Sequence, residues 1–545
     1  MKQVTCCLLL TIILFSSCAH KEKADLLVYN ATIYTVDDRF STTEAMVIRG
    51  GKILATGTTA DLENKYDCTL KEDAGGKFIY PGFIDAHAHF VGYANSLQRV
   101  NLVGTTSWEE LVTRTQQFAA ENPTGWVLGR GWDQNDWAQK QFPSNEKLNE
   151  LFPDRPVLLS RIDGHAAIAN QKALELAGLK PGQTISGGEI ETRNGKLTGI
   201  LVDNAVSLVA NQAPPPGDAA LLKALQAAEK NCFEVGLTTI DDCGLPDTTI
   251  EKIRQWQNAG ELKMRLYIML SDEKRNYEFA KKNGMIKTPY LNVRSFKVYG
   301  DGALGSRGAC LLAPYSDQPG HYGFLLSDPA HFDSVARVID QLGWQMCTHA
   351  IGDSGNRTIL HIYAKYLKGN NDRRWRIEHA QVINAADFKL FGENNIIPSV
   401  QPTHATSDMP WAATRLGADR VKGAYAYAQL LAQNKWIPLG TDFPVEDISP
   451  FKTFYAAVVR KDGEGSPAAG FQMENALTRE QALRGMTGWA AKANFEETEK
   501  GSLEKGKLAD FVILDHDLMK EAPEKLLQVK VIATYSGGVR MYRKP

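Results

Sequence analysis

The sequence lacks an excess of charge of either sign. Its 545 residues include 61 basic and 63 acidic side chains, which gives a net charge of -2. A protein that binds nucleic acid through its phosphates needs a basic surface, and no such excess exists here. There is also no acidic tail, low-complexity tract or short repeat, which argues against a solenoid. We therefore expect a small-molecule partner and no nucleic acid.

Cysteine is scarce and scattered. Of the eight cysteines, Cys6 and Cys7 lie in an apolar leader and Cys18 follows it. The others show no CxxC spacing, which argues against a zinc knuckle and against a disulfide framework. We expect most of them to be buried thiols. They are Cys68, Cys232, Cys243, Cys310 and Cys347.

The apolar run at the N-terminus, from Cys6 to Phe15, is too short to span a bilayer stably. Because a basic residue precedes it and small residues follow, residues 1–18 are predicted to be a lipoprotein signal peptide. "FSSC" resembles a bacterial lipobox with Cys18 as the lipidated residue, although Phe stands where Leu is commoner. Cleavage near Ser17 and an uncleaved anchor are the alternatives. We expect an exported protein whose lipid anchor is its only membrane contact, at the outer membrane or facing the periplasm.

Short β-rich pieces stand at both ends of the chain, and neither is long enough to bury a core alone. We expect residues 25–80 and 498–545 to pair into one small β-sandwich. Between them, strand-like and helix-like stretches alternate over 81–497, which predicts an α/β fold, a (β/α)8 TIM barrel. The first two predicted barrel strands are much farther apart in the sequence than the later ones. This gap predicts an α/β insertion at about 95–225, with a hairpin at Asn194-Gly195. The expected barrel strands are 78–90, 236–243, 262–270, 293–300, 344–350, 373–380, 395–404 and 435–442.

Catalytic residues in such barrels lie at the C-terminal ends of the strands. His87 and His89, in "DAHAH", are two residues apart and project from one face of a strand. Such a pair alone is more often a solvated polar face than a metal site. Of the eleven histidines, however, five fall at the predicted ends of four strands, which indicates one shared metal site. They are His87, His89, His349, His379 and His404.

Four motifs connect these residues to a known family. The HxH strand, a lysine in "FKVYGDGALGSR", two later histidines and an aspartate in "GTDFPVE" resemble the pattern of the amidohydrolase superfamily. Together with "DGHAAIANQKAL" and "WRIEHAQ", they resemble the branch that contains the N-substituted formamide deformylases (amidohydrolase family 3). The resemblance covers nearly the whole mature chain, and it implies the same barrel and split β-sandwich.

The resemblance also implies a dinuclear metal site. His87, His89 and Asp442 would bind the first ion, and His349 and His379 the second. Lys297, carboxylated by CO₂, would bridge both ions, because burial is expected to lower its pKa and make the neutral amine accessible. The alternative is an unmodified Lys297 beside one ion. Zinc suits these ligands, and Fe, Mn, Co and Ni use similar sets.

A metal-activated hydroxide would attack the substrate carbonyl, since a bound ion lowers the pKa of water toward roughly 7. Asp442 would take the proton and deliver it to the leaving nitrogen. We therefore predict an amidohydrolase that cleaves a C–N bond, an amide or formamide, of a small molecule. Deamination, or a lyase or isomerase step on the same site, is the first alternative. A non-catalytic surface lipoprotein that binds metal or a ligand is the second.

Further residues, near the strand ends and in the insertion, are predicted to contact the substrate. His165, in the insertion, is expected to reach over the barrel mouth, with a helix-capping role as its alternative. Trp132 and Trp137 are expected to lie in a core, with a pocket-lining role as the alternative. Barrels of this type often form dimers, which leaves a homodimer open. The predicted substrate contacts are His165, Asp301, Arg307, Gln401 and His404.

Overall fold

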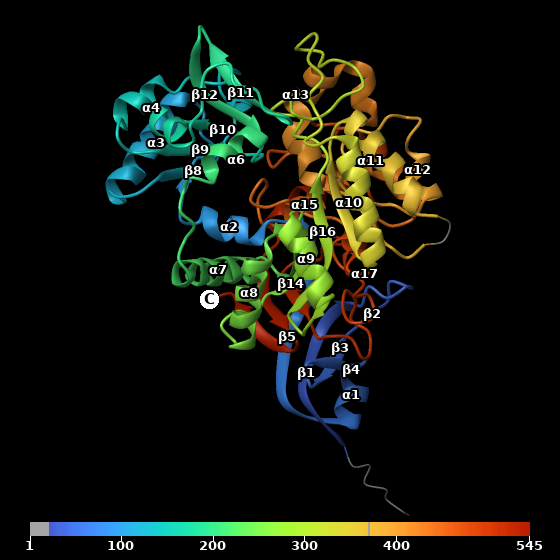
Figure 1. The fold of residues 1–545 in the computed structure, drawn as a ribbon. Helices are drawn as coiled ribbons and strands as arrows, with labels where there is room; N and C mark the ends of the chain where they lie inside the picture. The colour runs from blue at the N-terminus through green and yellow to red at the C-terminus, as the bar shows by residue number, and fades with distance from the viewer. Residues whose placement is uncertain (1–20, 369–370) are drawn as a thin grey trace, which may run out of the picture.

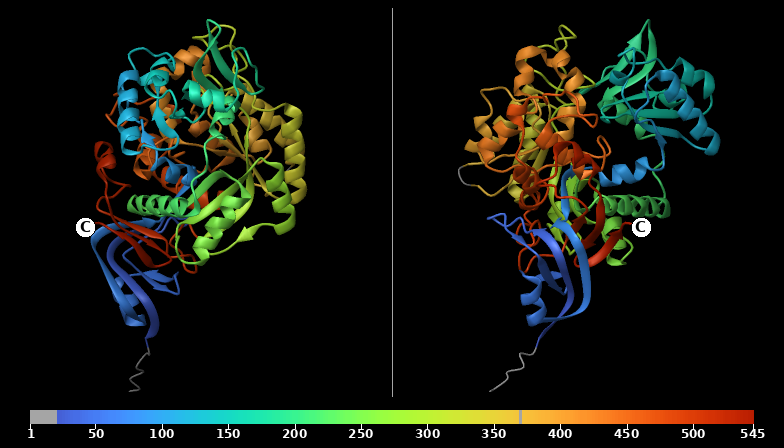
Figure 2. Two further views of the ribbon diagram at one scale, coloured as in Figure 1. Left: turned by 60° about the vertical axis from the view of Figure 1, so that its left-hand side comes forward. Right: turned by 180° about the vertical axis from the view of Figure 1, so that it is seen from behind.

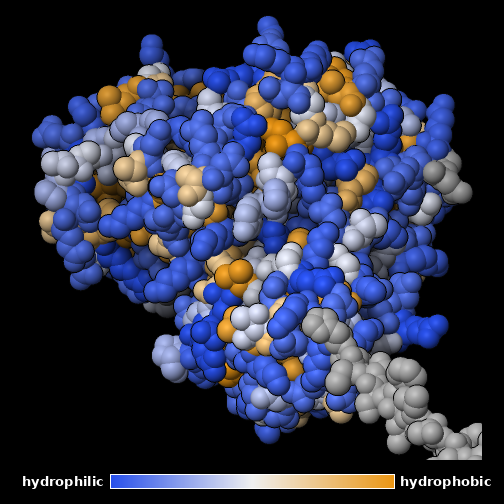
Figure 3. All heavy atoms as spheres, turned by 90° about the horizontal axis from the view of Figure 1, so that it is seen from below, coloured by the Kyte–Doolittle hydropathy of each residue, from blue (hydrophilic) through white to orange (hydrophobic). Residues whose placement is uncertain are grey.

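The structure is a computed structural model that describes residues 21–368 and 371–545. Three sheets organise it, one at the barrel, one from both chain ends and one inserted (Figure 1). The predicted signal peptide, 1–18, and its Cys18 lie outside the described residues. Within the described ranges, no helix has both the length and the apolar character needed to cross a membrane. The face seen from below is mostly hydrophilic, with scattered hydrophobic residues (Figure 3).

Seven parallel strands form the barrel sheet. Their order is β19-β18-β17-β16-β14-β13-β6, so neighbours in the sheet follow one another along the chain. This confirms the predicted α/β class and a nearly closed parallel barrel. A short strand, β15, pairs antiparallel with β16. The bounds are β6 Phe83–Ala88, β13 Leu237–Leu245, β14 Arg265–Ser271, β15 Ile286–Lys287, β16 Leu291–Tyr299, β17 Gln345–Ala350, β18 Arg376–His379 and β19 Ile397–Ser399.

The predicted eighth strand, 435–442, is not a regular strand. One isolated parallel bridge and single backbone hydrogen bonds join this segment to the residue after β19 on one side and to β6 on the other. Pro438 has no N–H to donate to a ladder. A Cβ at Gly440 would lie 2.5 Å from the backbone nitrogen of His87, so the segment passes unusually close to β6. The barrel is therefore closed by an irregular segment.

Two other strand predictions have the wrong bounds. The stretch 395–404 divides into β19 and the helix α13 (Pro402–Arg420), which begins at a proline, a residue favoured in the first helical turn. His404 therefore lies in a helix and not at a strand end. The stretch 78–90 divides at Gly82 between β5 and β6, where a Cβ would lie 2.4 Å from Thr238.

Strands from both chain ends share one sheet of eight strands. The strands from the N-terminal part of the chain and those from the C-terminal part meet where β5 and β20 pair antiparallel. A buried ion pair fixes this sheet to the barrel, since Arg265 Nε lies 2.8 Å from Asp510 Oδ2. The further division into a sandwich stays a prediction. The bounds are β1 Glu22–Tyr34, β2 Thr42–Thr43, β3 Ala45–Arg49, β4 Lys52–Gly57, α1 Thr59–Lys65, β5 Tyr66–Pro81, β20 Phe511–Leu514, β21 Val531–Ser536 and β22 Val539–Arg543.

The insertion between β6 and β13 forms its own six-stranded sheet, which stands above the barrel (Figures 1 and 2). Trp132 and Trp137 are buried in its core, 5.8 Å apart between ring centroids, as expected. Asn194 and Gly195 both have positive φ and make the predicted hairpin turn. The bounds are β7 Val100–Asn101, α3 Trp108–Glu121, β8 Val127–Trp132, α4 Glu146–Leu151, β9 Val157–Arg161, β10 Ala166–Ala169, α5 Gln171–Leu176, β11 Gly188–Arg193, β12 Lys196–Asp203 and α6 Asn204–Ala210.

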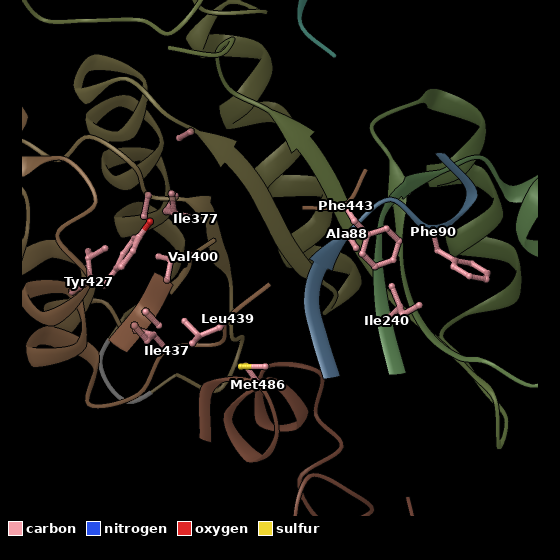
Figure 4. Packing of buried hydrophobic residues seen from close by; sticks show 14 of the residues in the cluster. Ala88, Phe90, Ile240, Ile377, Val400, Tyr427, Ile437, Leu439, Phe443 and Met486 are labelled. Carbon is pink, nitrogen blue, oxygen red and sulfur yellow. The ribbon is translucent and has the colours of Figure 1, made fainter. Parts of the chain in front are cut away.

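The remaining helices cover the barrel and bury its apolar side chains. Figure 4 shows Ala88, Ile240 and Phe443 of this core beside the ends of β6 and β13. This packing fixes the strand ends that carry the polar side chains described next. The helices are α2 Phe90–Ser96, α7 Asp218–Glu234, α8 Asp247–Asn258, α9 Lys274–Asn283, α10 Pro329–Leu342, α11 Asp353–Tyr366, α12 Lys389–Glu393, α14 Tyr427–Asn434, α15 Pro450–Val459, α16 Arg479–Gly485 and α17 Gly488–Ala493.

Candidate metal centre

His87 and His89 converge on one carboxylate, as their spacing predicts. His87 lies on β6 and His89 directly before α2. Their Nε2 atoms lie 3.6 Å and 3.3 Å from Asp442 Oδ1. The three side chains bring their nitrogen and oxygen atoms close enough to hold one ion. The i, i+2 spacing, which places both side chains on one face, was the signal for this pair.

Glu378 fixes the orientation of His87. Its Oε2 lies 2.6 Å from His87 Nδ1, and both side chains are fully buried. Burial, with the charge of Lys297, lowers the pKa of His87 to about 4. The ring is therefore neutral near pH 7, and with Nδ1–H donated to Glu378, its Nε2 lone pair faces the centre. Sequence reasoning missed Glu378, although an acid inside the buried strand "WRIEHAQ" was a visible signal.

Asp442 offers an unused oxygen to this centre. Its Oδ1 is buried and has no hydrogen-bond partner among the described residues, and the same holds for His379 Nδ1. Both residues have positive φ, 65° and 73°, which turns them out of the strand path at the barrel mouth. Buried polar atoms without partners are rare, so this pair marks a place where another group belongs. A divalent cation fits a set of neutral imidazoles and a carboxylate.

His349 and His404 both lie beside His379 but differ in protonation. Burial lowers the pKa of His349 and His379 well below the usual value, so both rings are neutral and carry a free lone pair. Their centroids are 4.5 Å apart. Burial also disfavours the charged form of His404, but hydrogen bonds with Asp442 (3.2 Å) and Glu446 (3.0 Å) raise its pKa well above the usual value.

Proximity alone groups His404 with His379 and Asp442 as a possible ligand set. A protonated imidazole has no lone pair for an ion, however, and both His404 nitrogens already have partners. The neutral His349 is therefore the better partner for His379. His404 is better described as a cation that pairs with Asp442.

Lys297 lies inside the centre, with Nζ 3.3 Å from His87 Nε2. Burial lowers its pKa, as expected, but nearby acidic groups, Cys243 first and then Tyr299, outweigh burial and raise the pKa above its usual value. The expectation of a readily neutral amine is therefore wrong, since it counted burial without these neighbours. No carboxylate forms an ion pair with Lys297 in the described part of the chain.

Three predicted substrate contacts do not line the main cavity, which lies between the inserted sheet and the barrel mouth. Asp301 accepts backbone hydrogen bonds from Ile351, Gly352 and Cys310, at 2.8–2.9 Å, so its carboxylate holds loops together. Arg307 pairs with Asp317 at 2.8 Å, away from this cavity. Gln401 is buried and donates to Ser399 O at 3.3 Å. A strand-end position in sequence did not reveal that backbone groups engage Asp301 and the Gln401 amide nitrogen, or that Asp317 engages Arg307.

His165 does reach the site from the insertion. Its ring lies 5.0 Å from that of His349, and its Nδ1 lies 2.5 Å from Asp203 Oδ1. The helix-capping alternative belongs to Asn170, whose side chain accepts from the first turn of α5. His165 helps to line a cavity of about 880 Å³ between the inserted sheet and the barrel mouth. A volume of that order is typical of a small-molecule site.

Comparison with known proteins supports this description. The sequence pattern of the family described as "Amidohydrolase family" matches residues 72–542. Protein LONG AFTER FAR-RED 3 of Arabidopsis thaliana is 33% identical over 540 residues, which cover 95% of this chain and 92% of that protein. The N-substituted formamide deformylase of Arthrobacter pascens is 26% identical over 550 residues, covering 95% and 98%.

Solved structures share the fold. A metal-dependent hydrolase from Pyrococcus horikoshii, described as uncharacterized, superposes with a TM-score of 0.75 at 25% identity and covers 91% of this chain and 99% of its own. An adenosine deaminase from Xanthomonas campestris with bound zinc gives a TM-score of 0.54 at 14% identity, covering 96% and 93%. At that identity, the deaminase supports the fold alone.

Proposed function

The chain belongs to the amidohydrolase family, and on that premise we propose that it is a metal-dependent hydrolase that cleaves a C–N bond, an amide or formamide, of a small molecule. The observation that carries the proposal is the convergence of buried histidines, among them the neutral His87, on one buried carboxylate, Asp442, in the wall of the large cavity. The formamide deformylase relative supports the choice of bond.

The donor set fits two divalent ions. His87, His89 and Asp442 would hold one, and His349 and His379 would hold the other. The unpartnered Asp442 Oδ1 and His379 Nδ1 support this assignment. When bound, a divalent ion supplies a Lewis acid that polarises a carbonyl and lowers the pKa of water. Zinc is the first choice for such nitrogen and oxygen donors.

Lys297 would join this site as a carbamate. Its neutral amine adds to the carbon of CO₂ and releases one proton, which leaves an anionic carboxylate on the side chain. That change converts a repelling ammonium, 3.3 Å from His87, into an anion that suits a cationic site. Because the surrounding acids raise the pKa of Lys297, the amine must lose its proton as the ions bind.

Asp442 is the proton carrier of the proposed reaction. Its Oδ2 accepts a hydrogen bond from His404 at 3.2 Å. Burial opposes ionisation, but the His404 hydrogen bond and the nearby imidazole of His89, whose Nε2 lies 3.3 Å from Oδ1, hold the Asp442 pKa well below its usual range. The side chain is therefore ionised, and in the proposed reaction it takes the proton of the attacking water. It returns that proton to the nitrogen as the C–N bond breaks, which yields a carboxylate and an amine.

The test begins with purified residues 19–545, metal analysis and a panel of formamides and amides. We expect about two ions per chain and release of a carboxylate with an amine. Asp442→Asn should lower kcat/KM by at least about 100-fold, in line with the loss of a general acid–base group. Asp447→Asn is the matched control, because Asp447 is exposed on the same segment, and its contacts with Lys452 and with the Ser449 N–H lie outside the metal centre.

Other outcomes identify the alternatives. Ammonia released from a ring substrate, without carboxylate, would indicate a deaminase. Metal or ligand binding with no turnover of any kind would indicate a non-catalytic protein. Full activity in Asp442→Asn would overturn the proposed mechanism.

A further inference from the structure

Three arginines line the main cavity, and only one of them is neutralised. Arg161 forms ion pairs with Asp133 and with Asp163, the latter at 2.5 Å. Arg99 and Arg130 form no ion pair with any carboxylate in residues 21–368 and 371–545. Two of the three cavity guanidinium groups thus have no carboxylate at ion-pair distance among the described residues.

Arg99 has no side-chain partner at all in the described chain. It lies between α2 and β7, where the barrel passes into the insertion, and it is half-buried in the cavity wall. Figure 1 shows α2 below the inserted sheet and above α7. Burial alone lowers the pKa of Arg99, with no nearby anion to raise it. Partial burial of a charge without a counter-charge is unfavourable, so this arrangement needs an explanation.

Arg130 stands close to Arg99 and next to the proposed metal centre. Its guanidinium donates to the backbone oxygen of Pro444, two residues after Asp442, and to Ile162 O at 2.7 Å. These carbonyls position the group without neutralising it. Burial lowers the pKa of Arg130, the charges of Asp442 and Asp163 oppose that shift, and the like charge of Arg99 adds to it, so Arg130 has anions and a second guanidinium in its surroundings.

The acids on the insertion side of the cavity are largely engaged. Asp133 and Asp163 pair with Arg161, and Asp203 pairs with His165. Asp136 also lines the cavity but is exposed to solvent. Burial and then the charge of Asp133 raise its pKa. The cavity that Asp442 lines therefore keeps one guanidinium without a counter-charge, that of Arg99, near the guanidinium of Arg130.

We propose that Arg99 and Arg130 form an anion subsite that receives a carboxylate or similar anionic group of the substrate while its amide lies at Asp442. The substrate class is then an amide that carries a negative charge on the part away from the cleaved bond. Guanidinium groups suit this role because their N–H groups match a planar carboxylate. That the substrate is an amide rests on the proposed function. That it carries a negative charge rests on the arginines that form no ion pair.

The experiment uses two formamides that differ only in charge, N-formylleucine and its carboxamide, and measures formate release by metal-loaded protein. We expect the anionic compound to have the higher kcat/KM. Arg99→Gln should lower the ratio of the two kcat/KM values by about 10–100-fold, the range expected for a lost charge-assisted contact. Arg99→Lys, which keeps the charge, should restore part of the ratio.

Arg193→Gln is the matched control, since Arg193 is exposed on the hairpin of the insertion, pairs with Glu191 and does not line this cavity. It should leave the ratio within about twofold of wild type. Equal kcat/KM for the two compounds in wild type, or an unchanged ratio in Arg99→Gln, would overturn the anion subsite while the hydrolase proposal stands.

If neither compound is hydrolysed, equilibrium binding separates the two proposals. Calorimetric titration of Asp442→Asn with N-formylleucine should show binding that weakens about 10–100-fold when Arg99→Gln is added. Binding with this dependence would keep the subsite although the choice of bond is wrong. Binding with the same affinity in the presence and absence of Arg99→Gln, or no binding of the anion at all, would overturn the anion subsite.

Discussion

Glu378 Oε2 and His87 Nδ1 lie 2.6 Å apart, and both side chains are completely buried. One strand, β18, thus carries a metal-ligand candidate, His379, and the residue that orients a ligand on another strand. Because a carboxylate that accepts from a ligating imidazole fixes its tautomer and raises its basicity, Glu378 belongs to the metal centre even though it would not touch an ion.

Glu378→Gln tests this relationship. Glutamine keeps the shape and can still accept from His87, but it removes the negative charge. We expect zinc affinity to fall about 10–100-fold, the usual cost of losing such a partner. Competition with a chelator of known affinity measures it. Unchanged affinity would mean that Glu378 serves only the packing of the barrel interior.

The histidine spacing in β6 made the core of this site predictable, because a strand has a fixed period of two and leaves little freedom. The positions of Asp301 and Arg307 were not predictable in the same way. Their partners, backbone N–H groups for Asp301 and Asp317 for Arg307, come from loops whose course depends on the folded chain. The sequence also could not show that His404 lies in the first turn of a helix, since its strand-like run continues past Pro402.

The protonation state of a side chain, like the path of a loop, depends on which residues surround it in the folded chain. Lys297 was correctly expected to be buried, yet its pKa depends on side chains that come from separate strands. The same holds for His349 and His404. Both were predicted at the ends of barrel strands, yet their pKa values shift in opposite directions. Sequence reasoning counted both as histidines at strand ends, and only the three-dimensional surroundings separate a ligand from a cation.

A pair of variants tests that separation. His349→Asn should lose about one of two ions per chain, because the neutral ring is assigned to the second ion. His404→Asn should keep both ions and lose activity, since it removes the hydrogen bond that holds Asp442 ionised. Metal analysis with kcat/KM on the same preparations measures both. Loss of metal in His404→Asn with full loading of His349→Asn would reverse the assignment.

Carboxylation of Lys297 has its own signature. The raised pKa keeps the amine protonated in the ion-free chain, so addition of CO₂ should increase as pH rises and as metal is supplied. The intact mass in native buffer with bicarbonate should then exceed that of the denatured chain by one CO₂. Lys297→Arg, which cannot form this carbamate, should show no difference. A fully metal-loaded wild type without the added mass would leave Lys297 as an ammonium beside His87.

The last prediction concerns Asp203 and pH. Asp203 Oδ1 lies 2.5 Å from His165 Nδ1, and although burial disfavours the imidazolium, Asp203 raises the His165 pKa above 6.5. A raised histidine pKa adds stability that is complete below the unfolded value and is lost as pH rises through the folded value. Asp203→Asn removes this contribution, so its deficit in unfolding free energy relative to wild type should be larger at about pH 6 than at about pH 9.

Urea unfolding of both proteins at the two pH values measures this difference, and His165→Gln should show a similar loss of pH dependence. Asp203 has a positive φ of 50°, so both variants leave the strained backbone in place and change only the side-chain pair. A deficit that is equal at both pH values would mean that the pair contributes packing and not charge. His165 would then be held over His349 by the turn between β9 and β10 alone.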